Sequence, residues 1–152
     1  MAFTAQDVKA LREKTGVGMM ECKKALVEAD GDMDKAVDFL RERGLAAAQK
    51  KATRIAAEGV VLPYYDAQAK KGVVVEVNSE TDFVAKNEKF MNFVEGVAKT
   101  ILATNPADVE ALKEEKFDGT DRTVTETLND LVLSIGENMK VRRFERMDGV
   151  VS

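Results

Sequence analysis

Asp82 and Phe83 are the adjacent pair in this 152-residue sequence whose chemistry best suits contact with another molecule. They lie in the run SETDFV at 79–84, between a β-rich segment and a helix-like one, and loops held by regular elements often carry binding residues. An acidic and an aromatic side chain projecting together would present a contact to a partner protein. The alternative is local, with Asp82 capping a turn and Phe83 stapling the next helix to the core. From the residues alone, the local interpretation is favoured.

The residue types exclude most catalytic and metal chemistry. The sequence has no His and a single Cys, Cys22, which rules out zinc sites of Cys and His, Ser-His or Cys-His catalysis, and an internal disulfide. Neither GxxxxGK[ST] nor GxGxxG occurs, so we expect the chain to bind no nucleotide of its own. We predict no catalytic residue, no cofactor and no metal, and we expect Cys22 to be a small buried core residue.

Charge and hydropathy narrow the choice of partner and location. The formal net charge is −4, from 23 Lys plus Arg and 27 Asp plus Glu, which argues against nucleic acid as the main partner. The two basic clusters are expected to be solvated faces: Lys50, Lys51 and Arg54, and Arg142, Arg143 and Arg146. No run approaches 18 apolar residues and the N-terminus lacks a signal-peptide pattern, so we predict a cytoplasmic protein without a membrane segment.

The elements that must position these residues are helical up to about residue 57. Three helices are expected, the first capped by Thr4 and the third by Asp32, with Gly44 as a C′ residue. An Ala-rich helix over 45–57 follows. Met19 continues the apolar stripe of the second helix and Met20 falls beside it, where a gap-filling core role is favoured over an adaptable binding surface.

At Gly59 the hydrophobic period changes from that of a helix to that of a strand. The runs 60–65 and 73–78 predict a hairpin, with Pro63 placing the first strand at an edge. A helix beginning near Asn87, a short helix over 107–115 and a helix capped by Thr123 follow. The basic run 140–146 predicts a third strand with a bulge or an early end. The fold class is therefore α+β.

Three runs resemble the bacterial elongation factor Ts family. The segment LREKTGVGMMECKKALVEADGDMDKAVDFLRERG is similar to its N-terminal helical domain, and EVNSETDFVAKNEKF is similar to its most diagnostic segment. The run SIGENMKVRRFER is similar to a third hallmark. The three runs lie in the family's order, and only about residues 104–123 match it poorly.

The resemblance implies a domain organisation and an activity. It implies a ubiquitin-associated-like helical domain at 1–44, a linker helix at 45–57, a core subdomain of antiparallel sheet and helices at 58–149, and a truncated continuation beginning at 150–152. It implies guanine-nucleotide exchange on elongation factor Tu in translation elongation, without enzymatic bond chemistry. The implied contacts with this partner fall on ten residues: Arg12, Met19, Met20, Thr81, Asp82, Phe83, Val84, Ile135, Gly136 and Asn138.

One departure from the family and one rival function leave alternatives open. Many family members carry a second core subdomain and a further helical module, so we expect more protein to follow Ser152, or else a short form that self-associates. The rival function is a non-catalytic helical adaptor that binds ubiquitin-like or other protein partners, with the sheet purely structural.

Overall fold

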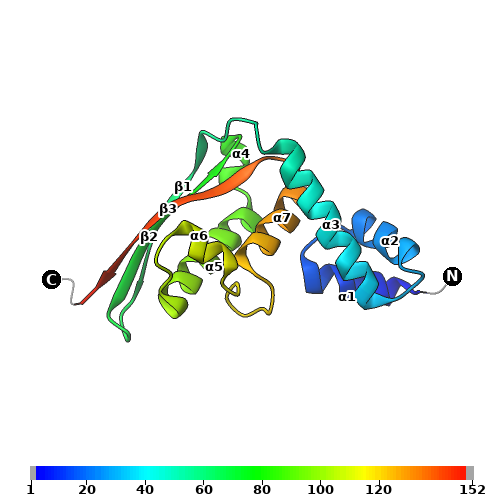
Figure 1. Ribbon diagram of the computed structural model, residues 1–152, viewed down its shortest axis with the longest axis horizontal. Helices are drawn as coiled ribbons and strands as arrows, with labels where there is room; N and C mark the ends of the chain where they lie inside the picture. The colour runs from blue at the N-terminus through cyan, green and yellow to red at the C-terminus, as the bar shows by residue number, and fades with distance from the viewer. Residues whose placement is uncertain (1–2, 150–152) are drawn as a thin grey trace. The chain divides into compact units, whose positions relative to one another are not determined.

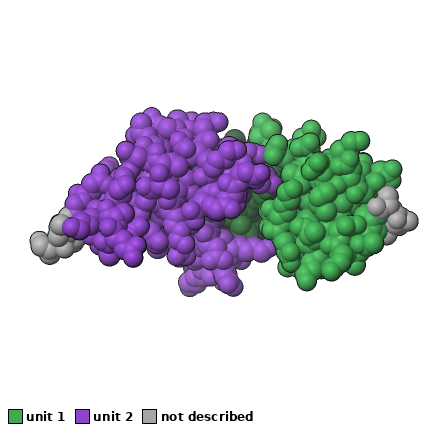
Figure 2. Space-filling view, turned by 90° about the horizontal axis from the view of Figure 1, so that it is seen from below, with its two compact units in different colours: residues 1–53, 129–137 green, residues 54–128, 138–152 purple. Residues whose placement is uncertain are grey.

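The computed structural model describes residues 3–149, which form two compact units. Of the described residues, 3–53 and 129–137 belong to unit 1, and 54–128 and 138–149 belong to unit 2 (Figure 2). The α+β class is confirmed, because helices precede a three-stranded antiparallel sheet that is itself packed with helices (Figure 1). The domain bounds given above stay a prediction, and residues 150–152, predicted to begin a continuation, lie outside the described residues.

Unit 1 is built on three helices whose ends follow local capping chemistry. These are α1 (Ala5–Thr15), α2 (Met19–Glu28) and α3 (Met33–Lys51). The capping box of Thr4 and Asp7 is present, and the Asp32 carboxylate accepts a hydrogen bond from the Lys35 backbone N–H at 3.1 Å. The buried faces of the three helices close into one apolar core, against which Leu133 also packs.

The predicted end of the third helix at Gly44 is wrong, because α3 continues without a break from Met33 to Lys51. A Cβ on Gly44 would lie 3.1 Å from the Asn129 carbonyl oxygen, so the glycine serves close packing against residue 129. The predicted Ala-rich helix therefore joins the third helix, and residues 54–57 are not helical.

The sheet of unit 2 has the order β1-β2-β3, with all neighbours antiparallel. Its strands are β1 (Glu58–Asp66), β2 (Lys71–Ser79) and β3 (Met139–Asp148). The predicted hairpin is confirmed, and Pro63 lies in the edge strand β1. The bulge predicted in the third strand is also confirmed, since the register of β2 and β3 shifts between Glu76 and Val77.

One face of the sheet is covered by helices and forms the core of unit 2. Helix α5 (Glu88–Thr104) lies against β1 and β2, and its stripe of Phe90, Phe93, Val94, Val97 and Ile101 is buried as predicted. The short α6 (Val109–Glu114) contacts β3, and α7 (Val124–Ile135) begins at the predicted capping box of Thr123 and Glu126. The opposite face, here called the outer face, bears exposed apolar side chains: Val61, Tyr65 and Met147.

Candidate functional site

The segment that carries Asp82 and Phe83 is a short helical turn fixed at the end of β2. Helix α4 (Asp82–Ala85) has Thr81 as its N-cap, whose hydroxyl accepts a hydrogen bond from the Val84 backbone N–H at 3.5 Å. The Ser79 hydroxyl donates to the Thr81 carbonyl at 2.9 Å. Within this turn Val84 is 6% exposed, whereas Phe83 is 82% exposed. The turn is anchored by Val84 and presents Asp82 and Phe83 to solvent.

The favoured local interpretation of this segment is therefore wrong. Thr81, and not Asp82, caps the turn, and Phe83 does not staple a helix to the core. Neighbouring residues in a helix point about 100° apart, so only one member of an adjacent apolar pair can point fully inward. Val84 occupies the inward position, which leaves the larger Phe83 outside.

Asn138 lies beside this segment through a network that the sequence did not reveal. The Asn138 backbone N–H donates to Glu80 Oε2 at 2.9 Å, and its side-chain amide donates to the Arg54 carbonyl at 2.8 Å. Arg54 Nη1 lies 3.7 Å from the same Glu80 oxygen. Three distant stretches of unit 2 therefore meet at the residue that precedes Thr81. The signal in the sequence was only the opposite charge of Glu80 and Arg54.

In unit 1 the structure places Arg12 and Met19 in one groove of about 580 Å³ between α1 and α2. Met19 is 57% exposed and Met20 is 70% exposed, so the predicted core role of this pair is wrong. Val17, in the turn before α2, fills the core position instead. Besides these two, the groove is lined by apolar, basic and uncharged polar residues: Phe3, Thr4, Ala5, Gln6, Val8, Lys9 and Lys23. An apolar floor with a basic rim suits an acidic, partly apolar protein surface.

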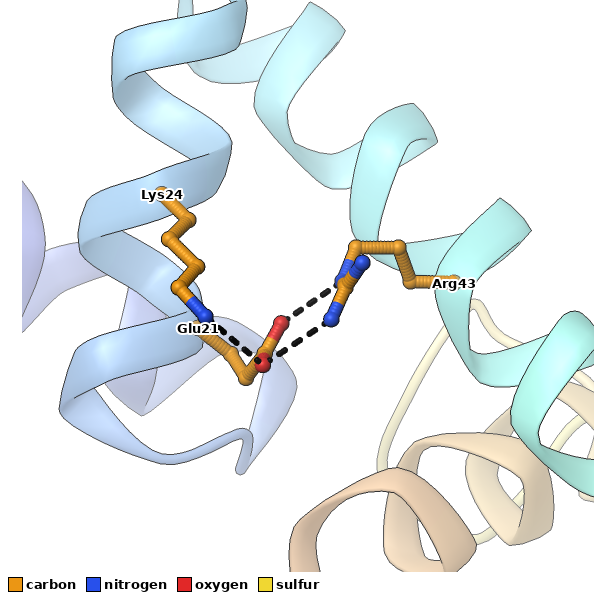
Figure 3. A network of polar contacts seen from close by, with 3 residues as sticks. All are labelled: Glu21, Lys24 and Arg43. Atoms are coloured by element: carbon orange, nitrogen blue, oxygen red, sulfur yellow. Dashed lines mark hydrogen bonds and ion pairs between the residues drawn. The ribbon is translucent and has the colours of Figure 1, made fainter.

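The start of α2, which carries the two methionines, is tied to α3 by a bidentate ion pair (Figure 3). Arg43 Nε lies 2.7 Å from Glu21 Oε2, and Arg43 Nη2 lies 3.0 Å from Glu21 Oε1, with Lys24 Nζ 3.8 Å from the latter oxygen. The hydrogen bonds from Arg43 hold the pKa of Glu21 below its ordinary value, against the opposing effect of desolvation. The pair therefore links the first turn of α2, which carries Met19 and Met20, to α3.

The remaining candidates, Ile135 and Gly136, lie at the C-terminal end of α7. Gly136 has φ +86°, a left-handed conformation that ends the helix, and its N–H donates to the Val132 carbonyl at 2.8 Å. Ile135 is half-buried and Gly136 is exposed. The candidates thus form two sets, one in unit 1 and the other around Thr81–Val84 and Asn138 in unit 2.

Within residues 3–149, no cluster of three or more Cys, Asp or Glu side chains could hold a metal ion, and no helix is long and apolar enough to cross a membrane. Cys22 is buried, and desolvation raises the pKa of its thiol. Arg142 and Arg143 lie 3.8 Å and 2.7 Å from Glu76, so their charges are already partly neutralised within the sheet.

Comparisons with known proteins find relatives of this α+β chain. A family model described as Elongation factor TS matches residues 80–152. Elongation factor Ts of Clostridium perfringens strain 13 is 59% identical over 144 residues, which cover 95% of this chain and 47% of that protein. Elongation factor Ts of Syntrophotalea carbinolica is 55% identical over 148 residues, covering 97% of this chain and 48% of the relative.

The resemblance inferred from the three sequence motifs is therefore confirmed. The chain is homologous to elongation factor Ts over nearly its whole length. It spans about half the length of the curated relatives that it matches.

Proposed function

We propose that the chain acts in translation elongation as a guanine-nucleotide exchange factor for elongation factor Tu. The observation that carries the proposal is Phe83, a large apolar side chain that is 82% exposed on a turn anchored by Val84 and Thr81. Such a side chain has no role in the core of unit 2 and is suited to insertion into a partner. The names of the curated relatives support a role in translation elongation.

The proposed mechanism follows from thermodynamic linkage. A factor that binds the nucleotide-free GTPase more tightly than the GDP-bound form must weaken GDP binding by the same factor. In this mechanism Phe83 inserts against the GTPase domain, with Asp82 beside it, and makes a contact that differs between the two states. The chain makes and breaks no bond in this process. It is therefore not an enzyme in the ordinary sense, and it needs neither a cofactor nor a nucleotide of its own.

The other candidate residues are proposed to supply affinity. Arg12, in the last turn of α1, offers charge, and Met19 and Met20, at the start of α2, offer adaptable apolar surface, since methionine side chains fit varied partners. Thr81, Val84 and Asn138 hold or adjoin the Phe83 turn, and Ile135 and Gly136 add surface at the end of α7. The proposed role places the chain in the cytoplasm. Nucleic acid and membranes are not expected partners.

Release of fluorescent GDP from elongation factor Tu tests this proposal directly. The release rate is measured against the concentration of the chain, and the proposal requires an acceleration that saturates. Leu45→Ala, which truncates an exposed apolar side chain of α3 outside the candidate residues, is the control for Phe83→Ala. An adaptor would bind the GTPase, or another protein, without changing the release rate. No acceleration at any concentration would refute the exchange function.

A further inference from the structure

Glu80 is the point at which three sequence-distant stretches of unit 2 meet. Its Oε2 atom accepts the Asn138 backbone N–H at 2.9 Å and lies 3.7 Å from Arg54 Nη1. The side-chain amide of Asn138 in turn donates to the Arg54 carbonyl at 2.8 Å. The segment before β1, the end of β2 and the start of β3 are thus joined at one carboxylate.

The location of Glu80 connects this network to the exposed turn. It follows Ser79, the last residue of β2, and precedes Thr81, the N-cap of α4. The turn beyond it has only four helical residues, and a helix this short cannot be stable by itself. Its geometry must therefore come from the groups that hold it: Val84 in the core, the hydrogen bond from Ser79, and the Glu80 carboxylate.

We propose that Glu80 is a positioning residue that fixes the Asp82–Phe83 turn to Asn138 and Arg54, and so holds Phe83 ready for contact with the GTPase. This inference rests on the exchange function proposed above. Glu80 itself need not touch the partner, since its side chain is only 19% exposed and is directed into the network. Its effect on exchange is transmitted through Phe83, because a fixed side chain loses less conformational freedom on binding than a mobile one.

The contacts of the network predict which of its side chains matters most for exchange. The Asn138 amide bonds to the Arg54 backbone, so removing the Arg54 side chain leaves that hydrogen bond in place. The Arg54 side chain is about half exposed and contributes only the 3.7 Å ion pair. Glu80→Ala should therefore impair exchange more than Arg54→Ala. Glu80→Gln, which keeps an oxygen able to accept the Asn138 N–H, should lie between wild type and Glu80→Ala.

The test is a double-mutant cycle on GDP release from elongation factor Tu. Glu80→Ala is expected to lower the acceleration about tenfold, and to have no further effect in a Phe83→Ala background. Non-additivity of this kind distinguishes positioning of Phe83 from a general loss of stability. A general loss of stability would reduce the acceleration of GDP release by the same factor in the wild-type and Phe83→Ala backgrounds. Glu110→Ala is the control, because it removes one carboxylate and one ion pair, with Lys113, from the exposed side of α6.

A second readout needs no partner. Amide hydrogen exchange in the free chain should be faster at Asn138 and Val84 in Glu80→Ala than in wild type, because the acceptor that holds the turn is gone. If wild type fails to accelerate GDP release, the exchange function is refuted, while unchanged amide exchange in Glu80→Ala refutes the positioning role. Equal losses on the wild-type and Phe83→Ala backgrounds would also refute it. Should Glu80→Ala not fold, Glu80→Gln provides the same cycle with a smaller expected loss.

Discussion

Replacing Phe83 with Ala separates the contribution of this side chain to folding from its contribution to binding. Phe83 is 82% exposed, so folding buries less than a fifth of it. A phenylalanine side chain offers about 200 Å² of surface. At about 25 cal/mol per Å², burial of a fifth of that area stabilises the fold by about 1 kcal/mol at most. The loss of stability in Phe83→Ala should stay within that limit.

The effect of the same substitution on exchange should be larger. An aromatic side chain that is fully buried at an interface typically contributes about 2 kcal/mol or more, so GDP release should slow by about thirtyfold. The assay is the rate of GDP release at a fixed concentration of the chain below saturation, run beside thermal unfolding of the same preparation. A small loss of folding stability together with a large loss of exchange rate identifies a side chain that contacts the partner.

Phe90→Ala provides the opposite case and serves as the control. Phe90 is fully buried in the core of unit 2, and truncating such a residue costs about 3–5 kcal/mol of folding stability. If Phe83→Ala lowered the melting temperature as much as Phe90→Ala does, Phe83 would belong to the core and the reasoning would be refuted. Unchanged exchange in a stable Phe83→Ala variant would refute the insertion mechanism.

Three further predictions concern stability and self-association. Because pairing with Arg43 lowers the pKa of Glu21, the charged pair stabilises the fold above pH 4.5, and this stabilisation is lost as the pH falls further. Glu21→Gln should therefore lower the free energy of unfolding by about 1 kcal/mol at pH 7 and by little at pH 2. Urea unfolding at both pH values measures the difference. A Cβ on Gly96 would overlap the Phe117 ring, so Gly96→Ala should lose about 1–3 kcal/mol in the same assay, and an unchanged midpoint would contradict that packing. The exposed apolar outer face should pair with a second copy of the chain, and Tyr65→Lys should raise the monomer fraction in light scattering, whereas a wild-type monomer at all concentrations would contradict this.

The elements that the sequence predicted best were those whose structure depends on interactions between residues close together in the chain. The stripe of α5 from Phe90 to Ile101 is regular over about three turns, and its N-cap Asn87 accepts hydrogen bonds from the backbone N–H groups of Lys89 and Phe90. The bulge in β3 followed from Val141 and Phe144, two apolar residues whose odd spacing cannot share one face of a regular strand. In each case the deciding interaction spans only a few residues.

The predictions that failed depend on contacts between distant residues. Nothing near Gly44 indicates that the backbone at Asn129 will pack against it, and without that contact a helix-ending role is the reasonable expectation. Met19 is exposed because Val17 occupies the core position that the sequence pattern assigned to Met19. The link from Glu80 to Asn138 spans 58 residues. The motif at 79–84 marked the position of the candidate site, but its orientation required the tertiary structure.

Burial of Cys22 makes this chain a convenient host for a single reporter dye. Its thiol donates to the Val17 carbonyl at 3.4 Å, and its raised pKa keeps the reactive thiolate scarce near neutral pH. A cysteine placed at Gln68, in the exposed turn between β1 and β2, would therefore be modified selectively. Strand β2 spans about 26 Å from Lys71 to Ser79, so a dye in that turn would lie well away from Phe83. Complex formation could then be followed by fluorescence anisotropy without a label in the proposed interface.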